Sequence, residues 1–150
     1  MNVTVYSKST ALRMIAVGFP ENVAVVSFYT PIGRANPARF RVEYGTACDR
    51  VFYVGVPDID ESGFEANGFT SESFLREADA LADFIYAARD EGRDIICQCD
   101  FGVGRSAACA AAILEHFEGR GIEILASDRY HPNMTVYNRV LAALERRSKK

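Results

Sequence analysis

The stretch from Ile95 to Ser106 constrains the fold more than any other part of this chain. Its sequence is Ile-Ile-Cys-Gln-Cys-Asp-Phe-Gly-Val-Gly-Arg-Ser. A short apolar run ends at a thiol, two glycines and an arginine follow, and the alanine-rich segment from Ala107 to Leu114 has the composition of a helix. The stretch therefore predicts a strand, a short loop and a helix in direct succession.

Four segments have the composition of β-strands. They are Asn2–Tyr6, Val23–Phe28, Val51–Val56 and Asp94–Gln98. The second of these is apolar except at Ser27, which is the pattern of a strand covered on both faces, as parallel strands are. We therefore expect an α/β fold in which a central, mostly parallel sheet of about four strands is flanked by helices.

The predicted helices lie between and after these strands. They are a helix that begins after Ser7 and runs to Val17, one that is capped by Thr70 or Ser71 and ends near Gly92, one over Ser106–Phe117, and a last one that Pro132 and Asn133 open. Segment 30–46 is expected to be a long loop with at most a short extended piece, and Ser62–Thr70 a loop that contains glycine. Ile122–Leu125 is a candidate extended segment.

Composition and charge limit the domain count and the partners. The chain has 150 residues, of which 49% are hydrophobic and 25% charged, and this matches one compact domain over residues 1–150. The net charge of -3 argues against a nucleic-acid binder with a basic surface, and no apolar run has the length of a membrane span. We expect a cytoplasmic monomer whose partners include neither nucleic acid nor a membrane.

The four cysteines, at positions 48, 97, 99 and 109, are expected to be reduced, because no segment resembles a signal peptide. The chain has only two histidines and no second close pair of cysteines, so the sequence argues against a zinc site and predicts no metal. Cys97 and Cys109 are expected to be small buried side chains. Cys48 is a candidate for a reversible bridge to Cys99.

The loop from Cys99 to Arg105 has the composition of an anion site. A short loop that runs into a helix turns several backbone N–H groups toward one point, which suits the oxygens of a phosphate. Gly102 and Gly104 allow backbone angles that other residues resist. Arg105 adds a planar cation that can hold two phosphoryl oxygens. Such surroundings favour the thiolate form of Cys99, which is the nucleophile.

The run from Cys99 to Ser106, Cys-Asp-Phe-Gly-Val-Gly-Arg-Ser, carries a resemblance to a known family. The chain resembles the cysteine-dependent protein tyrosine and dual-specificity phosphatases, whose signature is Cys, five residues, Arg, and then Ser or Thr. Pro132-Asn133 before an apolar helix supports the resemblance more weakly. It covers about Val51 to Leu144, and Gly-x-Gly-Arg-Ser-Ala-Ala is most similar to the small single-domain members of microbes and their viruses.

The resemblance implies a phosphatase-like α/β fold and a two-step hydrolysis of phosphomonoesters without a cofactor. Cys99 would attack phosphorus, an aspartic acid would protonate the leaving oxygen, and Ser106 would hydrogen-bond the sulfur when the phosphocysteine is hydrolysed. The phosphate would be bound by the loop residues Asp100, Phe101, Gly102, Val103, Gly104 and Arg105. The substrate would be a phosphorylated protein or a small phosphomonoester.

Two aspartates are candidates for the general acid, because Asp58 and Asp60 both follow the end of the strand at 51–56. Asp58 is the first choice and Asp60 the second. Asp100 is interpreted as structural, because inside the loop it would repel an incoming phosphate. Gln98 is a departure from the family, which usually has a histidine before the nucleophile. Without that histidine the thiol could be less activated, although glutamine can still donate a hydrogen bond.

Two other functions remain open. One is a catalytically weak module that binds phosphate or a phosphoprotein, which the glutamine at 98 makes conceivable. The other is a sulfur or arsenate transferase that uses the same anion loop and needs neither aspartate. Arg34, Arg39 and Arg41 are candidates to receive an anionic substrate, but we favour solvated charges for them.

Overall fold

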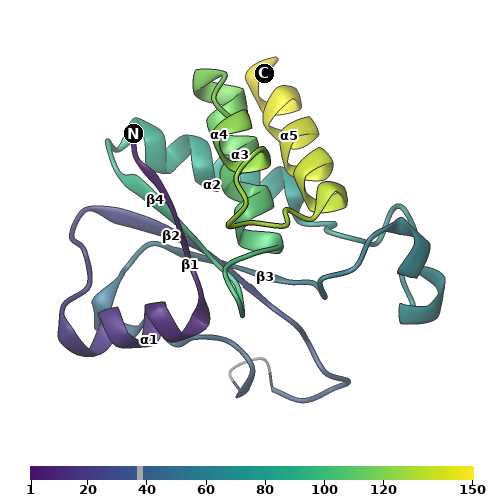
Figure 1. Ribbon diagram of the computed structural model, residues 1–150, viewed down its shortest axis with the longest axis horizontal. Coiled ribbons are helices and arrows are strands. Elements are labelled where there is room, and N and C mark those ends of the chain that lie inside the picture. The colour runs from purple at the N-terminus through teal and green to yellow at the C-terminus, as the bar shows by residue number, and fades with distance from the viewer. Residues whose placement is uncertain (37–38) are drawn as a thin grey trace.

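The computed structural model describes residues 1–36 and 39–150 and contains one four-stranded sheet in this part of the chain (Figure 1). The strands are β1 (Val3–Tyr6), β2 (Val23–Tyr29), β3 (Val51–Gly55) and β4 (Asp94–Gln98). Their order in the sheet is β1-β4-β2-β3, and every neighbouring pair is parallel. The predicted α/β class and parallel sheet are confirmed.

The helices cover both faces of this sheet. They are α1 (Lys8–Val17), α2 (Ala78–Asp90), α3 (Arg105–Glu118), α4 (Ile122–Leu125) and α5 (Met134–Ser148). In Figure 1, α2, α3, α4 and α5 lie above the sheet, while α1 and the connection from β2 to β3 lie below it. No helix in the described residues is long and apolar enough to cross a membrane.

The two faces of the sheet bury separate apolar clusters, because successive side chains of a strand point to opposite sides. On β4, Ile95 and Cys97 belong to the cluster under α2, α3 and α5, and Ile96 belongs to the one shared with α1. On β2, Val26 belongs to the cluster under α2, α3 and α5, and Val25 belongs to the one shared with α1. Both faces of these central strands are therefore buried, as the near-continuous apolar run of β2 predicts.

Small residues let α3 lie close to the sheet and to α5. The alanines with no exposed surface are Ala107, Ala108, Ala110, Ala111 and Ala112. Side chains this small allow neighbouring backbones to approach closely, and the core is then filled by the larger residues of the facing elements. The helix that follows the loop from Cys99 to Gly104 is thereby fixed against both the sheet and the last helix.

The predicted start of α2 is wrong. Thr70 and Ser73 make reciprocal side-chain hydrogen bonds of 2.8 and 3.1 Å to each other's backbone N–H groups, as a helix cap would. The chain then turns at Leu75, whose φ of 54° lies in the left-handed region. A right-handed helix cannot pass through such a residue, so α2 begins only at Ala78.

Among the other connections, one differs from its prediction and two are loops, as expected, that contain short 3-10 helices. Ile122–Leu125 is a short helix, α4, and not an extended segment. The described residues of segment 30–46 contain no strand, and the loop ends in a 3-10 helix at Gly45–Ala47; positions 37 and 38 of this predicted loop lie outside the described residues. The glycine-bearing connection after β3 forms two 3-10 helices, Glu61–Gly63 and Glu65–Asn67.

Candidate active site

The carboxyl edge of the sheet gathers the predicted site residues, because parallel strands all end there. Tyr6 of β1 and Ser27 of β2 both pair with Gln98, the last residue of β4. Cys99 follows directly and leads into α3 across a short loop, while Thr30 and Val56 follow the ends of β2 and β3. Residues distant in the sequence are in this way brought beside the thiol.

The thiol of Cys99 is buried and contacts a hydroxyl. The side chain is only 2% exposed, and its Sγ lies 2.9 Å from the Oγ of Ser106 in the first turn of α3. Cys99 also donates its backbone N–H to the carbonyl of Tyr6 across 3.3 Å, which extends the β1–β4 pairing by one step. The nucleophile candidate is therefore held at the end of a strand with the serine hydroxyl beside it.

Close packing against α1 fixes the shape of the loop. Gly102 has a φ of 70°, and a Cβ atom there would lie 2.8 Å from the backbone nitrogen of Ser7. Only glycine suits both the backbone angle and this approach. The backbone N–H of Lys8 donates to the carbonyl of Asp100 at 3.1 Å, so the first turn of α1 supports the loop from outside.

The guanidinium of Arg105 is buried, and one of its edges is fully engaged. Its Nη1 donates to the Thr30 hydroxyl at 2.9 Å and to the Val56 carbonyl at 2.6 Å, and its Nη2 pairs with the Asp100 carboxylate at 3.3 Å. The Nε atom is buried and has no hydrogen-bond partner among the residues that the structure describes. A buried donor of this kind is suited to an oxyanion in the loop.

The structure separates the two acid candidates. Asp58 lies against the loop, since a Cβ atom at Gly104 would overlap its Oδ2 atom, and Asn133 Nδ2 donates to its Oδ1 at 2.8 Å. Asp60 instead accepts hydrogen bonds from the hydroxyl and the N–H of Ser62 and caps the first 3-10 helix. These bonds, the hydroxyl first, lower the pKa of the exposed Asp60.

The described residues form a hollow of about 320 Å³ at this site. It is lined by Asp58, Cys99, Phe101, Val103, Gly104, Arg105 and His131. The ring of Phe101 is 83% exposed and forms part of the rim. Cys99, Arg105 and Asp58 thus line one space.

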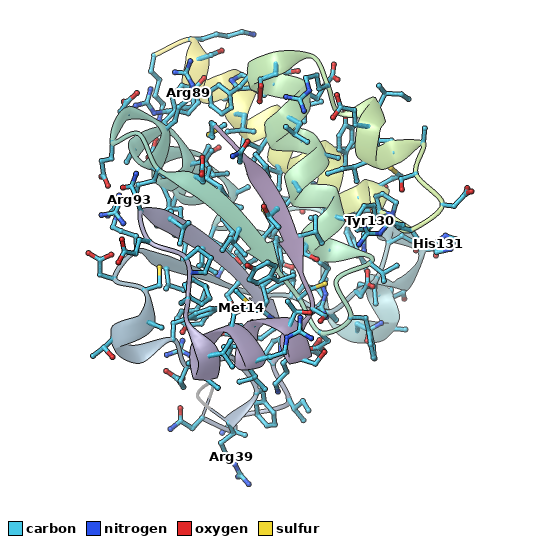
Figure 2. All side chains as sticks on the ribbon, turned by 60° about the vertical axis from the view of Figure 1, so that its left-hand side comes forward. Met14, Arg39, Arg89, Arg93, Tyr130 and His131 are labelled. Atoms are coloured by element: carbon cyan, nitrogen blue, oxygen red, sulfur yellow. The ribbon has the colours of Figure 1, made fainter. Side chains whose placement is uncertain are left out.

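His131 is a lining residue that the sequence analysis did not assign. Its backbone N–H donates to the carbonyl of Val103 at 3.0 Å, and the N–H of Asn133 donates to the carbonyl of Gly104 at 3.1 Å. The segment between α4 and α5 that carries Tyr130 and His131 is labelled in Figure 2. The neighbouring Pro132-Asn133 pair was the only signal in the sequence that pointed to this segment.

Gln98 lies buried beneath the loop with two hydroxyl groups around its amide. Its Oε1 accepts from Ser27 Oγ at 2.5 Å and from Tyr44 Oη at 2.8 Å, and its Nε2 donates to the Cys99 carbonyl at 3.1 Å. Burial raises the pKa of Tyr44 far above its usual range, so this phenol stays protonated. Neither Ser27 nor Tyr44 was predicted to approach the site.

The other cysteines do not reach the site thiol. Cys97 and Cys109 are fully buried, and the hydrogen bond between them, together with burial, raises the pKa of Cys97. Cys48 Sγ contacts the carbonyl of Val23 at 3.6 Å, at the opposite end of the sheet and about 16 Å from Cys99 along five strand residues. Cys48 was a candidate for a bridge to Cys99 only if the two lay close together, and this separation rules the bridge out in this structure.

The three arginines of the 30–46 loop do not line the hollow. Arg41 pairs with Glu43 at 3.1 Å and lies 4.0 Å above the Tyr53 ring centre. Arg34 and Arg39 are exposed, and Arg39 extends away from the sheet (Figure 2). This agrees with solvated charges for these residues. Among the described residues, no group of three or more His, Cys, Asp or Glu side chains is arranged to hold a metal ion.

Comparison with known proteins gives structural relatives only. No protein-family model and no curated protein matches the sequence. Among solved structures, PTPMT1 in complex with PI(5)P aligns with a TM-score of 0.57 and 16% identity over 99% of this chain and 93% of its own. A human tyrosine phosphatase-like serine/threonine/tyrosine-interacting protein aligns with a TM-score of 0.59 and 16% identity. This alignment covers 96% of this chain and 87% of that protein's chain.

A third match is human DUSP28, with a TM-score of 0.55 and 16% identity over 98% of this chain and 94% of its own. The alignments with these three structures extend over nearly the whole length of this chain. Identities this low establish architecture and not chemistry. The chain has the fold of the tyrosine and dual-specificity phosphatases.

Proposed function

We propose that this protein is a phosphomonoester hydrolase of the tyrosine or dual-specificity phosphatase type that acts through a phosphocysteine on Cys99. One observation carries the proposal: the thiol of Cys99, the guanidinium of Arg105 and the carboxylate of Asp58 line one hollow at the end of the sheet. A nucleophile, a permanent cation and a proton donor are the three groups that this transfer needs.

In the first step the thiolate of Cys99 attacks phosphorus in line with the leaving oxygen. The S–P bond forms as the P–O bond to the leaving group breaks. The carboxylic acid of Asp58 gives its proton to that oxygen. The Nε–H of Arg105 and the N–H groups of the loop stabilise the charge on the remaining phosphoryl oxygens.

In the second step water attacks the phosphocysteine and the S–P bond breaks. The carboxylate of Asp58 takes a proton from this water, and Cys99 leaves as a thiolate. The hydroxyl of Ser106, 2.9 Å from Sγ, stabilises the charge that returns to sulfur. Inorganic phosphate is the second product.

Turnover of p-nitrophenyl phosphate tests the proposal. We expect the wild-type protein to release p-nitrophenol and Cys99→Ser to lose all but a trace of this activity. Cys48→Ser is the matched control, because Cys48 is also buried but lies at the other end of the sheet. Equal rates for wild type and Cys99→Ser would overturn the proposal.

A second candidate is a module that binds phosphate or a phosphoprotein without efficient turnover. The ion pair between Asp100 and Arg105 favours it, because that carboxylate competes with phosphate for the cation. One protein with this fold bears the name of a tyrosine phosphatase-like interacting protein. Tight binding of inorganic phosphate with no turnover in the wild type would identify this function.

The placement of Asp58 beside the loop favours a phosphatase over a sulfur or arsenate transferase, which needs no acid there.

Phosphorylated proteins and small phosphomonoesters are the proposed substrates. PTPMT1, which shares the fold, was solved in complex with PI(5)P, so a phosphoinositide belongs in the same panel. A phosphotyrosine peptide, a phosphoserine peptide and a soluble phosphoinositide would be compared by release of inorganic phosphate. The substrate with the highest kcat/KM assigns the class.

A further inference from the structure

The amide of Gln98 is the centre of a buried polar cluster that the proposed chemistry does not use. Ser27 and Gln98 are almost completely buried, and so is Tyr44. Polar side chains this deep in a sheet are costly unless their hydrogen bonds are satisfied. Here the three groups satisfy one another, and among the described residues the side-chain bond that leaves the cluster goes to the carbonyl of Cys99.

Donor and acceptor chemistry fixes the orientation of this amide. The Cys99 carbonyl can only accept a hydrogen bond, so the NH₂ end of Gln98 must face it. The oxygen end then faces Ser27 and Tyr44, whose hydroxyls both donate. If the amide were turned over, two oxygens would meet at Cys99 and one bond of the cluster would be lost. The Cys99 carbonyl therefore selects which end of the amide faces it, and the two hydroxyls, which can donate or accept, hold the amide in this place.

We infer that Gln98, with Ser27 and Tyr44 behind it, is a positioning residue that fixes the first peptide group of the anion loop. This inference rests on the proposed function of that loop. A peptide group is planar and trans, so its C=O and N–H point in opposite directions. Because Gln98 holds the Cys99 carbonyl down toward the sheet, the N–H of Asp100 must point to the opposite side. The carbonyl dipole is also kept from turning toward the sulfur.

The cluster carries no charge that changes near neutral pH. An amide and a serine hydroxyl do not titrate, and Tyr44 stays protonated. The charged groups that line the hollow with the thiol are Asp58 after β3 and Arg105 in α3, and Asp100 in the loop pairs with Arg105. The thiol of Cys97 on β4 is a further neighbour of the Cys99 thiol. The glutamine thus supplies a fixed donor at the position before the nucleophile.

Three variants test the inference. Gln98→Leu removes the donor, Tyr44→Phe removes one of the groups that orient it, and Gln98→His restores an N–H group at the same position. Inorganic phosphate binding is measured as protection of Cys99 against iodoacetamide, with the labelled peptide identified by mass spectrometry. We expect phosphate to bind roughly tenfold more weakly to Gln98→Leu and about threefold more weakly to Tyr44→Phe, below the loss known for a direct oxyanion donor. Gln98→His should recover part of the loss.

Tyr53→Phe is the matched control. Tyr53 also lies in the cluster between the sheet and α1, but its hydroxyl donates to the Val42 carbonyl at 2.7 Å and not to Gln98. We expect it to lose stability as Tyr44→Phe does, but to keep wild-type phosphate binding and the wild-type pH dependence of alkylation. Thermal unfolding of each variant shows whether it is folded. If Gln98→Leu does not fold, Tyr44→Phe and Ser27→Ala carry the test.

Wild-type phosphate binding and an unchanged pH midpoint of alkylation in folded Tyr44→Phe and Ser27→Ala would overturn the inference. These readouts do not depend on turnover. A wild-type protein that binds phosphate but hydrolyses nothing would refute the proposed hydrolase and leave the positioning network open to the same measurement. Weaker phosphate binding in the Gln98 and Tyr44 variants, with binding unchanged in Tyr53→Phe, supports the positioning role of Gln98 whether or not the wild-type protein hydrolyses phosphomonoesters.

Discussion

Gly104 and Asp58 lie so close together that a methyl group on Gly104 would overlap the Asp58 carboxylate. The φ of Gly104, -103°, lies outside the left-handed region that favours glycine, and a steric constraint acts at this position. A Cβ atom there would overlap Oδ2 of Asp58, well inside van der Waals contact. The carboxylate of Asp58, the proposed acid, can therefore lie in this position only because Gly104 has no side chain.

We expect Gly104→Ala to lower kcat about tenfold or more, because the methyl group pushes Asp58 away from the leaving oxygen. Steady-state hydrolysis of p-nitrophenyl phosphate measures this. Gly63→Ala is the control, since a Cβ atom there meets its nearest neighbour only at 3.4 Å. An active Gly104→Ala variant would show that Asp58 does not act from the position seen in the structure.

The two acid candidates are predicted to differ in their effect on catalysis. Asp58→Asn should lower kcat by about a hundredfold for an alkyl phosphate, whose leaving oxygen needs a proton. Asp60→Asn should change it by no more than about threefold, because Asp60 caps a 3-10 helix and its carboxylate is bound to Ser62. The reverse order of effects would move the acid to Asp60.

These residues also show how far the sequence alone could lead. Cys99, Arg105 and Ser106 lie close together in the sequence, at the end of the loop and in the first turn of α3, so local spacing was enough to propose them. Both Asp58 and Asp60 follow the same strand, and the side chain that distinguishes them is Asn133, which contacts Asp58 from far along the chain. Such a choice depends on tertiary contacts and leaves no local signal.

At the scale of elements, local signals predicted every strand and most helices, but not all helix boundaries. Thr70 and Ser73 do form a cap-like pair, yet α2 starts later because Leu75 takes a left-handed angle. A leucine rarely adopts such an angle, and here the side chain is buried in the core in return. Tertiary packing overrides local preference at this position.

The cap of α5 is the element boundary with a functional consequence. Asn133 Oδ1 accepts from the N–H of Val136 at 3.0 Å, while its Nδ2 donates to Asp58 and to the carbonyl of Ile59. Asn133→Ala should therefore cost about 1 kcal/mol of unfolding free energy and also release Asp58. We expect kcat to fall at least about tenfold as well, measured beside chemical denaturation.

Ser7→Ala provides the comparison for that variant. Ser7 caps α1 by accepting from the N–H of Thr10 at 3.1 Å, and its side chain has no contact with Asp58. The loss of stability should be similar, at about 1 kcal/mol, with kcat much less affected than in Asn133→Ala. If both variants lose activity in proportion to stability, Asn133 acts only as a cap.

For the whole molecule, the alanines of α3 set how tightly the layers pack. Ala108→Leu would insert three carbons where no surface is exposed, and overpacking of this kind costs about 1–3 kcal/mol. We expect the midpoint of thermal unfolding to fall by several degrees, roughly 2–4 °C per kcal/mol in a chain of this size. Ala80→Leu, on the exposed side of α2, should leave it nearly unchanged. Similar midpoints for the two would contradict the close packing described for α3.

The hydrogen bond from Asn133 to Asp58 also orders events during synthesis. A growing chain on the ribosome contains the entire loop from Cys99 to Arg105 before Asn133 has been added. Until the start of α5 emerges, the reactive sulfur and its cation can exist without an oriented proton donor. Because α5 also packs on α3 and α2, a chain halted before Asn133 lacks the helix that fixes the loop as well as the side chain that orients the donor.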